Sequence, residues 1–168
     1  ANVNMNWFLG IRGSDHVLVA DFEEGAAGAT PGLNHPVAGT TPIPAGSGWH
    51  HAAATYDGTT WTLYLDGLQE ATLAAGQPVE SGSIQHAGLA TAMTSTGATQ
   101  GFFNGRLDEV RVWNVARTPA EIAADLPNEL ASGAGLIARW GLNDGAGPTA
   151  ANSVAGSAKL GMPKSSSS

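Results

Sequence analysis

Residues 49–73 carry the feature that most limits how this chain can fold. Two Asp-Gly pairs, at 57–58 and 66–67, separate three runs rich in threonine, aromatic and leucine residues. Asp-Gly adopts the positive φ angles of tight hairpin turns, and between such runs it is a strong hairpin signal. The sequence therefore predicts an antiparallel meander with strands at 49–56, 60–65 and 68–73.

The middle strand of this meander alternates between two kinds of side chain. Trp61, Leu63 and Leu65 occupy every second position, with threonines and a tyrosine between them. Because successive side chains of a strand point to opposite faces, one face is wholly apolar. We expect that face to pack in a core and the Thr/Tyr face to meet water.

The rest of the chain is predicted to be mostly strands and loops. Strands are expected at 7–11, 17–23, 84–90, 106–115 and 134–143, with a weak strand signal at 158–160. Residues 24–44 are expected to form a long loop with a short edge strand at 35–38, and residues 91–101 a second loop.

One short helix is predicted after the strand at 106–115. Thr118 is a good N-cap, Pro119 fits the first helical position, and Glu121 completes a capping box. Pro127 cannot continue the helix. The helix is therefore expected at 119–126.

Composition agrees with a single all-β domain and excludes several functions. The 168 residues include 23 Gly and 9 Pro, which indicate many turns. A net charge of −7 argues against a nucleic-acid partner. No cysteine is present, so disulfides and thiol chemistry are excluded. No run of about 18 apolar residues is present, so no membrane span is expected, and residues 1–10 lack the pattern of a signal peptide.

Two motifs resemble the laminin G-like, concanavalin A-like jelly-roll modules of bacterial secreted proteins. Residues 49–67 read W-H-H-A-A-A-T-Y-D-G-T-T-W-T-L-Y-L-D-G, and residues 105–122 read G-R-L-D-E-V-R-V-W-N-V-A-R-T-P-A-E-I. The resemblance implies an all-β fold, an antiparallel β-sandwich of the jelly-roll type. It implies less about function, since this fold hosts lectins, adhesins, glycosidases and lyases.

The chain lacks the opening strands of such a module, so its organisation is unusual. We expect a laminin G-like core at 1–133, a C-terminal strand and Gly/Ala-rich tail at 134–163, and a disordered tail at 164–168. Residues 136–156 resemble the opening strand of a family module. Either this strand completes the sandwich, or open edges pair with the rest of a longer polypeptide or with a second chain.

No catalytic residue is assigned from the sequence. A retaining glycosidase needs two carboxylates about 5 Å apart, and Asp21 with Glu23 is the best pair, since residues two apart on a strand share a face. A solvated end of an edge strand is the favoured explanation of that pair. Gln85 and His86 resemble part of a lyase motif whose companion segment is absent. His50 and His51 are adjacent and face opposite sides of a strand, which favours structural roles.

Calcium is the candidate cofactor, because members of this fold often bind it through oxygen ligands. Asp108 is expected on the inward face with two valines, where a carboxylate needs compensation by hydrogen bonds, an arginine or a metal. Asn143 and Asp144 in a Gly-rich turn are a second candidate site. Asp15 is a third, in the loop where the related pentraxins place calcium ligands.

A sugar ligand would stack on an exposed aromatic side chain. Trp7, beside Asn4 and Asn6, is the candidate, while the other four tryptophans are expected to pack within the sandwich. The sequence favours a non-catalytic recognition or adhesion module of a secreted or cell-surface bacterial protein, binding a glycan or a surface protein. The alternatives are a polysaccharide-cleaving enzyme and an assembly subunit that pairs through open sheet edges.

Overall fold

The computed structural model describes residues 4–145, 149–154 and 160–161. The chain divides into two compact units. The first unit is formed by Ala1–Gln85 with Ala116–Leu126, and the second by His86–Val115 with Pro127–Ser168. The boundary expected at residue 133 and the disordered tail expected at 164–168 stay predictions, the tail because it lies outside the described residues.

The described residues form twelve strands and one α-helix. Among these residues there is no helix with the length and hydropathy of a membrane span. The strands are β1 Trp7–Ile11, β2 Leu18–Phe22, β3 Val37–Ala38, β4 Ala52–Tyr56, β5 Thr60–Leu65, β6 Leu68–Ala74, β7 Thr91–Met93, β8 Thr99–Phe102, β9 Val110–Trp113, β10 Leu136–Trp140, β11 Thr149–Ala150 and β12 Leu160–Gly161. The helix α1 is Pro119–Asp125.

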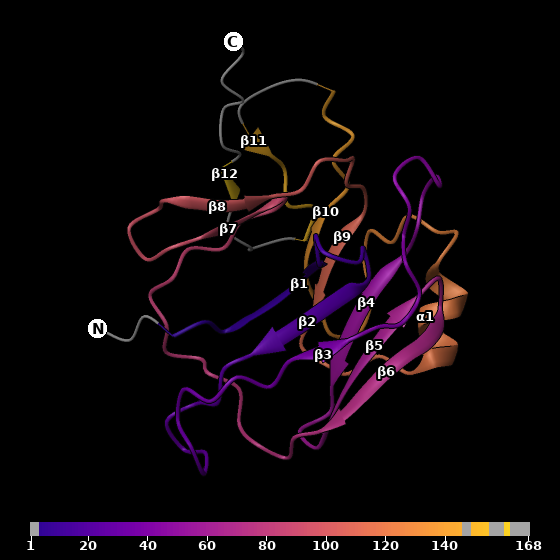
Figure 1. The fold of residues 1–168 in the computed structure, drawn as a ribbon. Coiled ribbons are helices and arrows are strands. Elements are labelled where there is room, and N and C mark those ends of the chain that lie inside the picture. The colour runs from indigo at the N-terminus through magenta and orange to yellow at the C-terminus, as the bar shows by residue number, and fades with distance from the viewer. Residues whose placement is uncertain (1–3, 146–148, 155–159, 162–168) are drawn as a thin grey trace. The chain divides into compact units, whose positions relative to one another are not determined.

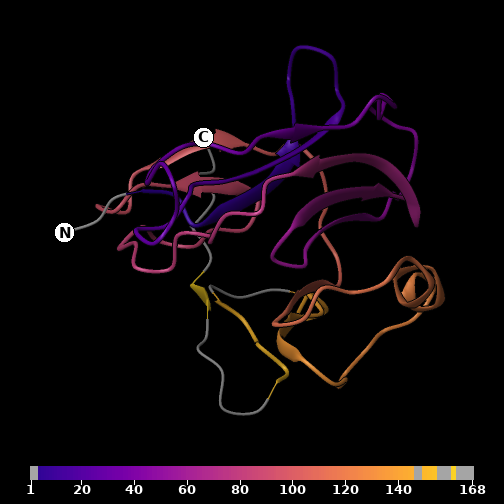
Figure 2. The ribbon, with the colours of Figure 1, turned by 90° about the horizontal axis from the view of Figure 1, so that it is seen from below.

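The first unit is a sandwich of two antiparallel sheets. One sheet has the strand order β1-β2-β3 and the other β4-β5-β6 (Figures 1 and 2). Both hairpins of the meander lie where the sequence predicts them, although β4 begins at Ala52 rather than Trp49. The short edge strand predicted near 35–38 is confirmed as β3, which pairs with β2.

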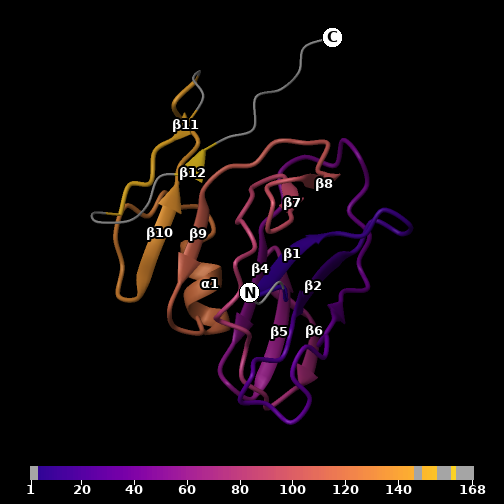
Figure 3. The same cartoon turned by 90° about the vertical axis from the view of Figure 1, so that its left-hand side faces the viewer.

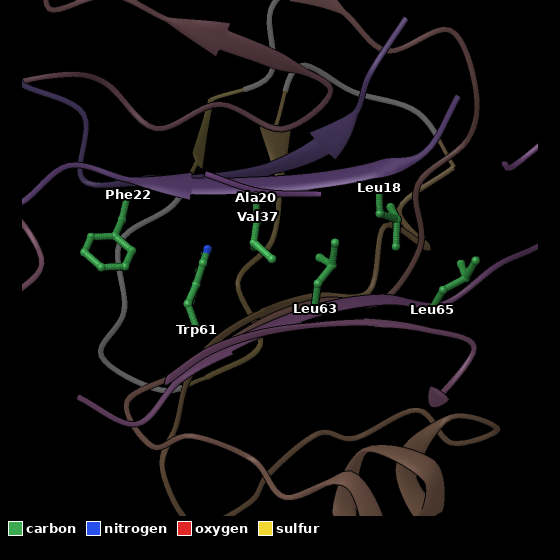
Figure 4. Packing of buried hydrophobic residues seen from close by; sticks show 7 residues of the cluster. All are labelled: Leu18, Ala20, Phe22, Val37, Trp61, Leu63 and Leu65. Carbon is green, nitrogen blue, oxygen red and sulfur yellow. The ribbon is translucent and has the colours of Figure 1, made fainter. Parts of the chain in front are cut away.

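The core of this unit lies between the two sheets. Figure 4 shows side chains from both layers pointing toward one another. The buried cluster consists of Leu18, Ala20, Phe22, Val37, Trp61, Leu63 and Leu65. The rings of Phe22 and Trp61 meet edge-on, with centroids 5.6 Å apart. Phe22 and Leu63 are fully buried, and burying a side chain of this size contributes about 1.5–3 kcal/mol.

The apolar face predicted for β5 is confirmed, but the prediction that its other face meets water is wrong. Thr62 and Tyr64 are buried as well. Helix α1 belongs to the same unit and contacts β6, and Figure 4 shows it on the side of the sheet away from the core. Alternation in the sequence reports which side chains share a face, and it does not report what packs over that face.

Helix α1 begins as the sequence predicts. The Thr118 hydroxyl accepts a hydrogen bond from the Glu121 N–H, and the Glu121 carboxylate accepts one from the Thr118 N–H at 2.8 Å. This hydrogen bond to the Thr118 N–H is the main cause that lowers the pKa of Glu121. The helix ends one residue before the predicted end.

The second unit consists of three separate two-stranded pairs, β7-β8, β9-β10 and β11-β12. Figure 3 shows β9 and β10 side by side, and they pair antiparallel with a bulge between Leu136 and Ala138. Two predictions are wrong here. Residues 84–90 form no strand, and the loop expected at 91–101 is the β7-β8 hairpin. Residues 158–159 of the weak strand signal lie outside the described residues.

Candidate functional site

The loop between β3 and β4 meets the β5-β6 turn through His50. The Nδ1 atom of His50 lies 2.8 Å from Oδ2 of Asp66, and its Nε2 atom lies 2.9 Å from Oγ of Ser47. The imidazole therefore joins a carboxylate on one side to a hydroxyl on the other. We call Ser47, His50 and Asp66 the histidine-centred triad.

The hairpin turn positions the Asp66 carboxylate. Asp66 and Gly67 have φ angles of 51° and 79°, as the Asp-Gly signal predicts for this kind of turn. The second carboxylate oxygen of Asp66 accepts the N–H of His51 at 2.8 Å. Burial raises the pKa of Asp66, but the hydrogen bonds from His50 and from the His51 N–H outweigh it and hold that pKa below its usual range. The carboxylate is thus ionised and fixed in direction at neutral pH.

The backbone around Ser47 is open to solvent. Gly46 and Gly48 have φ angles of 83° and 104°, and a side chain added at either would meet nothing within 4 Å. The Ser47 N–H bonds to the Pro44 carbonyl at 3.1 Å. The Ser47 hydroxyl lies 2.7 Å from the same carbonyl. The hydroxyl thus has two acceptors within reach, Pro44 O and His50 Nε2.

Trp49 lies between Ser47 and His50, and the prediction that it packs within the sandwich is wrong. It precedes β4, and 64% of its surface is exposed. The sequence carries a signal for this position that sequence reasoning missed. Residues 44–48 read P-A-G-S-G, which favours a turn up to Trp49 and not a strand that begins there.

Trp7, the tryptophan singled out from the sequence, lies in β1 and is 53% exposed. It pairs in register with Phe22 of β2. Its side chain is therefore on the same face of the sheet as that of Phe22, but it is not part of the buried core cluster. Asn6 is half-buried, and its Oδ1 atom is buried without a hydrogen-bond partner among the described residues. Asn4 lies near Gly32. The structure brings these three residues to one end of β1.

The expectation that Asp108 faces inward is wrong. Asp108 is exposed, and it is its neighbour Glu109 that lies among cations. Arg111 Nη2 lies 3.0 Å from Glu109 Oε2, and the Arg139 guanidinium bonds to both carboxylate oxygens. Burial raises the pKa of Glu109, but the two arginines outweigh it and lower that pKa. The compensation that an inward carboxylate requires is supplied here by arginines.

The other metal candidates do not come together. Both oxygens of Asp15 accept hydrogen bonds from Arg12, at 2.9 and 2.6 Å, and this pairing lowers the pKa of Asp15. Asn143 and Asp144 are exposed, and the Ala151 N–H donates to Asp144 at 3.3 Å. Within residues 4–145, 149–154 and 160–161, no three His, Cys, Asp or Glu side chains form a possible ligand set. Calcium stays a prediction.

The candidate catalytic acids lie at the end of β2. Burial raises the pKa of Asp21, and the charge of Glu23 adds to that rise. The Glu23 carboxylate accepts the Met5 N–H at 2.6 Å. Sequence reasoning missed the next residue, Glu24, which is buried and lies 3.1 Å from His35 Nε2. This second His–carboxylate pair closes the loop after β2.

The chain is similar to proteins of one superfamily. A laminin G family model, described as the concanavalin A-like lectin/glucanases superfamily, matches residues 2–123. Pappalysin-1 of Mus musculus is 37% identical over 78 residues, which are 46% of this chain and 5% of pappalysin-1. The fold is similar to that of a "putative carbohydrate binding protein" from Bacteroides ovatus, with a TM-score of 0.64 and 20% identity over 90% of this chain and 44% of that one. The chain thus spans less than half the length of either relative.

Proposed function

Because this chain belongs to the concanavalin A-like lectin/glucanases superfamily, we propose that it is a carbohydrate-binding module. The observation that carries the proposal is Trp49, which is 64% exposed and flanked in sequence by the polar groups of the histidine-centred triad. An exposed indole offers a flat apolar face on which a sugar ring can stack, and nearby polar atoms fix the orientation of the hydroxyls. The structural likeness to the Bacteroides ovatus protein supports the same proposal of carbohydrate binding.

The net charge of −7 favours neutral glycans over acidic ones. Trp7 at the end of β1, which is 53% exposed, is a second stacking surface, and Asn4 precedes it in the chain. We place Trp49 first because it is the more exposed of the two and because its polar neighbours are ordered by hydrogen bonds.

The test is calorimetry against a panel of soluble neutral polysaccharides. We expect Trp49→Ala to weaken binding about tenfold or more, which corresponds to about 1.4 kcal/mol, without a change in melting temperature. Leu68→Ala is the matched control, since Leu68 is 72% exposed and begins β6. Equal binding by the Trp49→Ala and Leu68→Ala variants would remove Trp49 from the site, and Trp7→Ala would then test the second surface.

The finer parts of the function are proposals too. We propose a secreted or cell-surface location, adhesion as the context, and no cleavage of glycosidic bonds. Incubating the same polysaccharides with the protein and measuring reducing ends tests for cleavage. Repeating the calorimetry with calcium and with a chelator tests whether binding depends on the ion.

Assembly through an open sheet edge is the second candidate function. Strand β1 ends its sheet, and its inward residues Trp7, Leu9 and Ile11 are 36–53% exposed. An exposed apolar edge strand is a template for pairing with another chain. This observation is independent of Trp49.

A further inference from the structure

The histidine-centred triad has the atom-by-atom order of a nucleophilic catalytic triad. The carboxylate of Asp66 meets Nδ1 of His50 at 2.8 Å, and the hydroxyl of Ser47 meets Nε2 at 2.9 Å. In triad hydrolases the carboxylate holds the imidazole in the tautomer whose Nε2 atom can take the serine proton. The arrangement is recognised by geometry and roles and not by sequence position.

The carboxylate is suited to that role. The Asp66 pKa is held low by hydrogen bonds from His50 and from the His51 N–H, so an anion faces the Nδ1–H. The Asp66 N–H also donates to the His51 carbonyl at 2.8 Å. These bonds tie the β5-β6 turn to the start of β4, so the direction of the carboxylate is set by backbone.

The nucleophile is reachable. Side chains at Gly46 and Gly48 are absent, and the space that they would fill is empty to 4 Å. An acyl group can therefore approach Ser47 from the solvent side. Among the residues that the structure describes, no hydrogen-bond acceptor is recorded for the Gly48 N–H, which leaves that donor next to Ser47 for the oxygen of a bound carbonyl.

We propose that Ser47, His50 and Asp66 hydrolyse short-chain carboxylic esters. Ser47 Oγ attacks the ester carbonyl carbon while its proton passes to His50 Nε2. The C–O bond to the alcohol breaks, and His50 returns the proton to the departing oxygen. Water then attacks the acyl-serine with His50 again as base, which releases the acid and restores Ser47. The overall reaction consumes one water and gives one acid and one alcohol.

This reaction goes beyond the proposed binding function and does not depend on it. It is acyl transfer, so it does not affect the proposal that glycosidic bonds are not cleaved.

The competing role of the histidine-centred triad is structural, as an anchor between the loop and the turn. In that role the His50 ring donates to both Asp66 and Ser47, while the Ser47 hydroxyl donates to the Pro44 carbonyl 2.7 Å away. An anchored hydroxyl has no base and does not react.

The first experiment uses the wild-type chain and a fluorophosphonate probe, which forms a covalent bond with an activated serine. We expect one adduct per chain, and peptide mapping is expected to place it on Ser47. Since no variant is involved, a folding defect cannot imitate the result. No adduct, or an adduct spread over exposed serines, would overturn the proposal.

The second experiment measures hydrolysis of p-nitrophenyl acetate. We expect Ser47→Ala and His50→Gln each to lower the rate at least about tenfold, since a positioned general base contributes about 10²–10⁴-fold. Ser14→Ala is the control, because Ser14 is an exposed loop serine in the same unit. Equal rates of hydrolysis for Ser47→Ala and the Ser14→Ala control would show that the triad has the structural anchoring role and is not catalytic. Polysaccharide binding by the wild-type chain, measured in parallel, separates failure here from failure of the binding function.

Discussion

Glu109 shows how a shift of one residue decides which carboxylate is half-buried and paired with arginines. Its φ angle of 50° is unusual for a residue with a side chain, and this turn sends its carboxylate to Arg111 and Arg139. Asp108, one position earlier, is left exposed. A one-residue change of phase moves every side chain of a strand to the other face. The prediction of an inward carboxylate at Asp108 is therefore wrong, and the half-buried carboxylate here is that of Glu109.

Replacing Glu109 tests the importance of this ion-pair cluster. We expect Glu109→Gln to lower the free energy of unfolding by about 2 kcal/mol, because hydrogen bonds to charged groups contribute about 1.5–3 kcal/mol and two largely buried guanidinium groups lose their anion. Urea denaturation measures the change. Glu129→Gln is the control, since Glu129 also pairs with Arg139 but is mostly exposed. A surface pair of that kind contributes at most about 1 kcal/mol.

The same cluster predicts a pH dependence. The folded pKa of Glu109 is lower than its unfolded pKa of about 4.3, because its arginine bonds outweigh the effect of burial. The stabilisation is therefore complete above that unfolded pKa and is lost as pH falls through the lower folded pKa. Wild type and Glu109→Gln should therefore converge in stability once the pH falls below the lowered folded pKa of Glu109. A constant difference between them down to low pH would show that the variant acts through packing.

At the scale of elements, the meander could be predicted closely because its turns and its alternation agree. Asp66 and Gly67 both have positive φ angles, and the Asp57 carboxylate accepts the N–H groups of Thr59 and Thr60 at 2.8 and 2.7 Å. Local chemistry therefore fixes where each strand ends. The capping box of α1 was predictable for the same reason.

The β7-β8 hairpin was missed because its sequence lacks that agreement. Residues 91–102 contain few large apolar side chains, so no buried face stands out. The available signals were weaker. Thr91 and Thr99 have β-branched side chains that suit strands, and Gly97 has the positive φ of 81° that the turn needs. Residues 84–90, predicted to be a strand, form none, since two alanines and a glycine among them offer little apolar surface to bury.

The two hairpin glycines give a matched pair of tests. Gly58 and Gly67 both have positive φ angles, but a side chain at Gly58 would enter open space, while a Cβ atom at Gly67 would lie 2.9 Å from Leu126. Both alanine variants carry the backbone strain of about 1 kcal/mol. We expect Gly67→Ala to have the lower melting temperature, because Leu126 must move as well. Equal melting temperatures would show that the Leu126 side chain moves aside without a cost in stability.

At the scale of the whole molecule, the sandwich could be predicted from the sequence, but the pairing of strands that lie far apart in the sequence could not. The two motifs indicated the superfamily, which the match over residues 2–123 confirms. They could not show that β10, from the C-terminal stretch, pairs with β9 in the second motif. Pairing between distant strands depends on which edges remain available once the rest has folded. The exposed position of Trp49 was not predicted, because the motif indicates the strand and gives no information on the conformation of the loop before it.

The last prediction concerns the edge at β1, where we expect a second copy of the chain to pair by two-fold symmetry. In an antiparallel β1–β1 pair centred on Leu9, Trp7 of one copy lies opposite Ile11 of the other. Each Phe8 then lies opposite a Gly10. The inward residues are exposed in the single chain, and the pairing would cover part of that apolar surface.

We therefore expect concentration-dependent dimers in sedimentation velocity, and a monomer for Leu9→Lys, because a charge pointing inward at an edge strand opposes pairing. Ile84→Lys is the control, since Ile84 is also half-exposed but belongs to no strand. If the wild type stays monomeric at every concentration, β1 does not pair with its own copy. If Ile84→Lys also dissociates the dimer, then general loss of apolar surface is responsible, and β1 is not the interface.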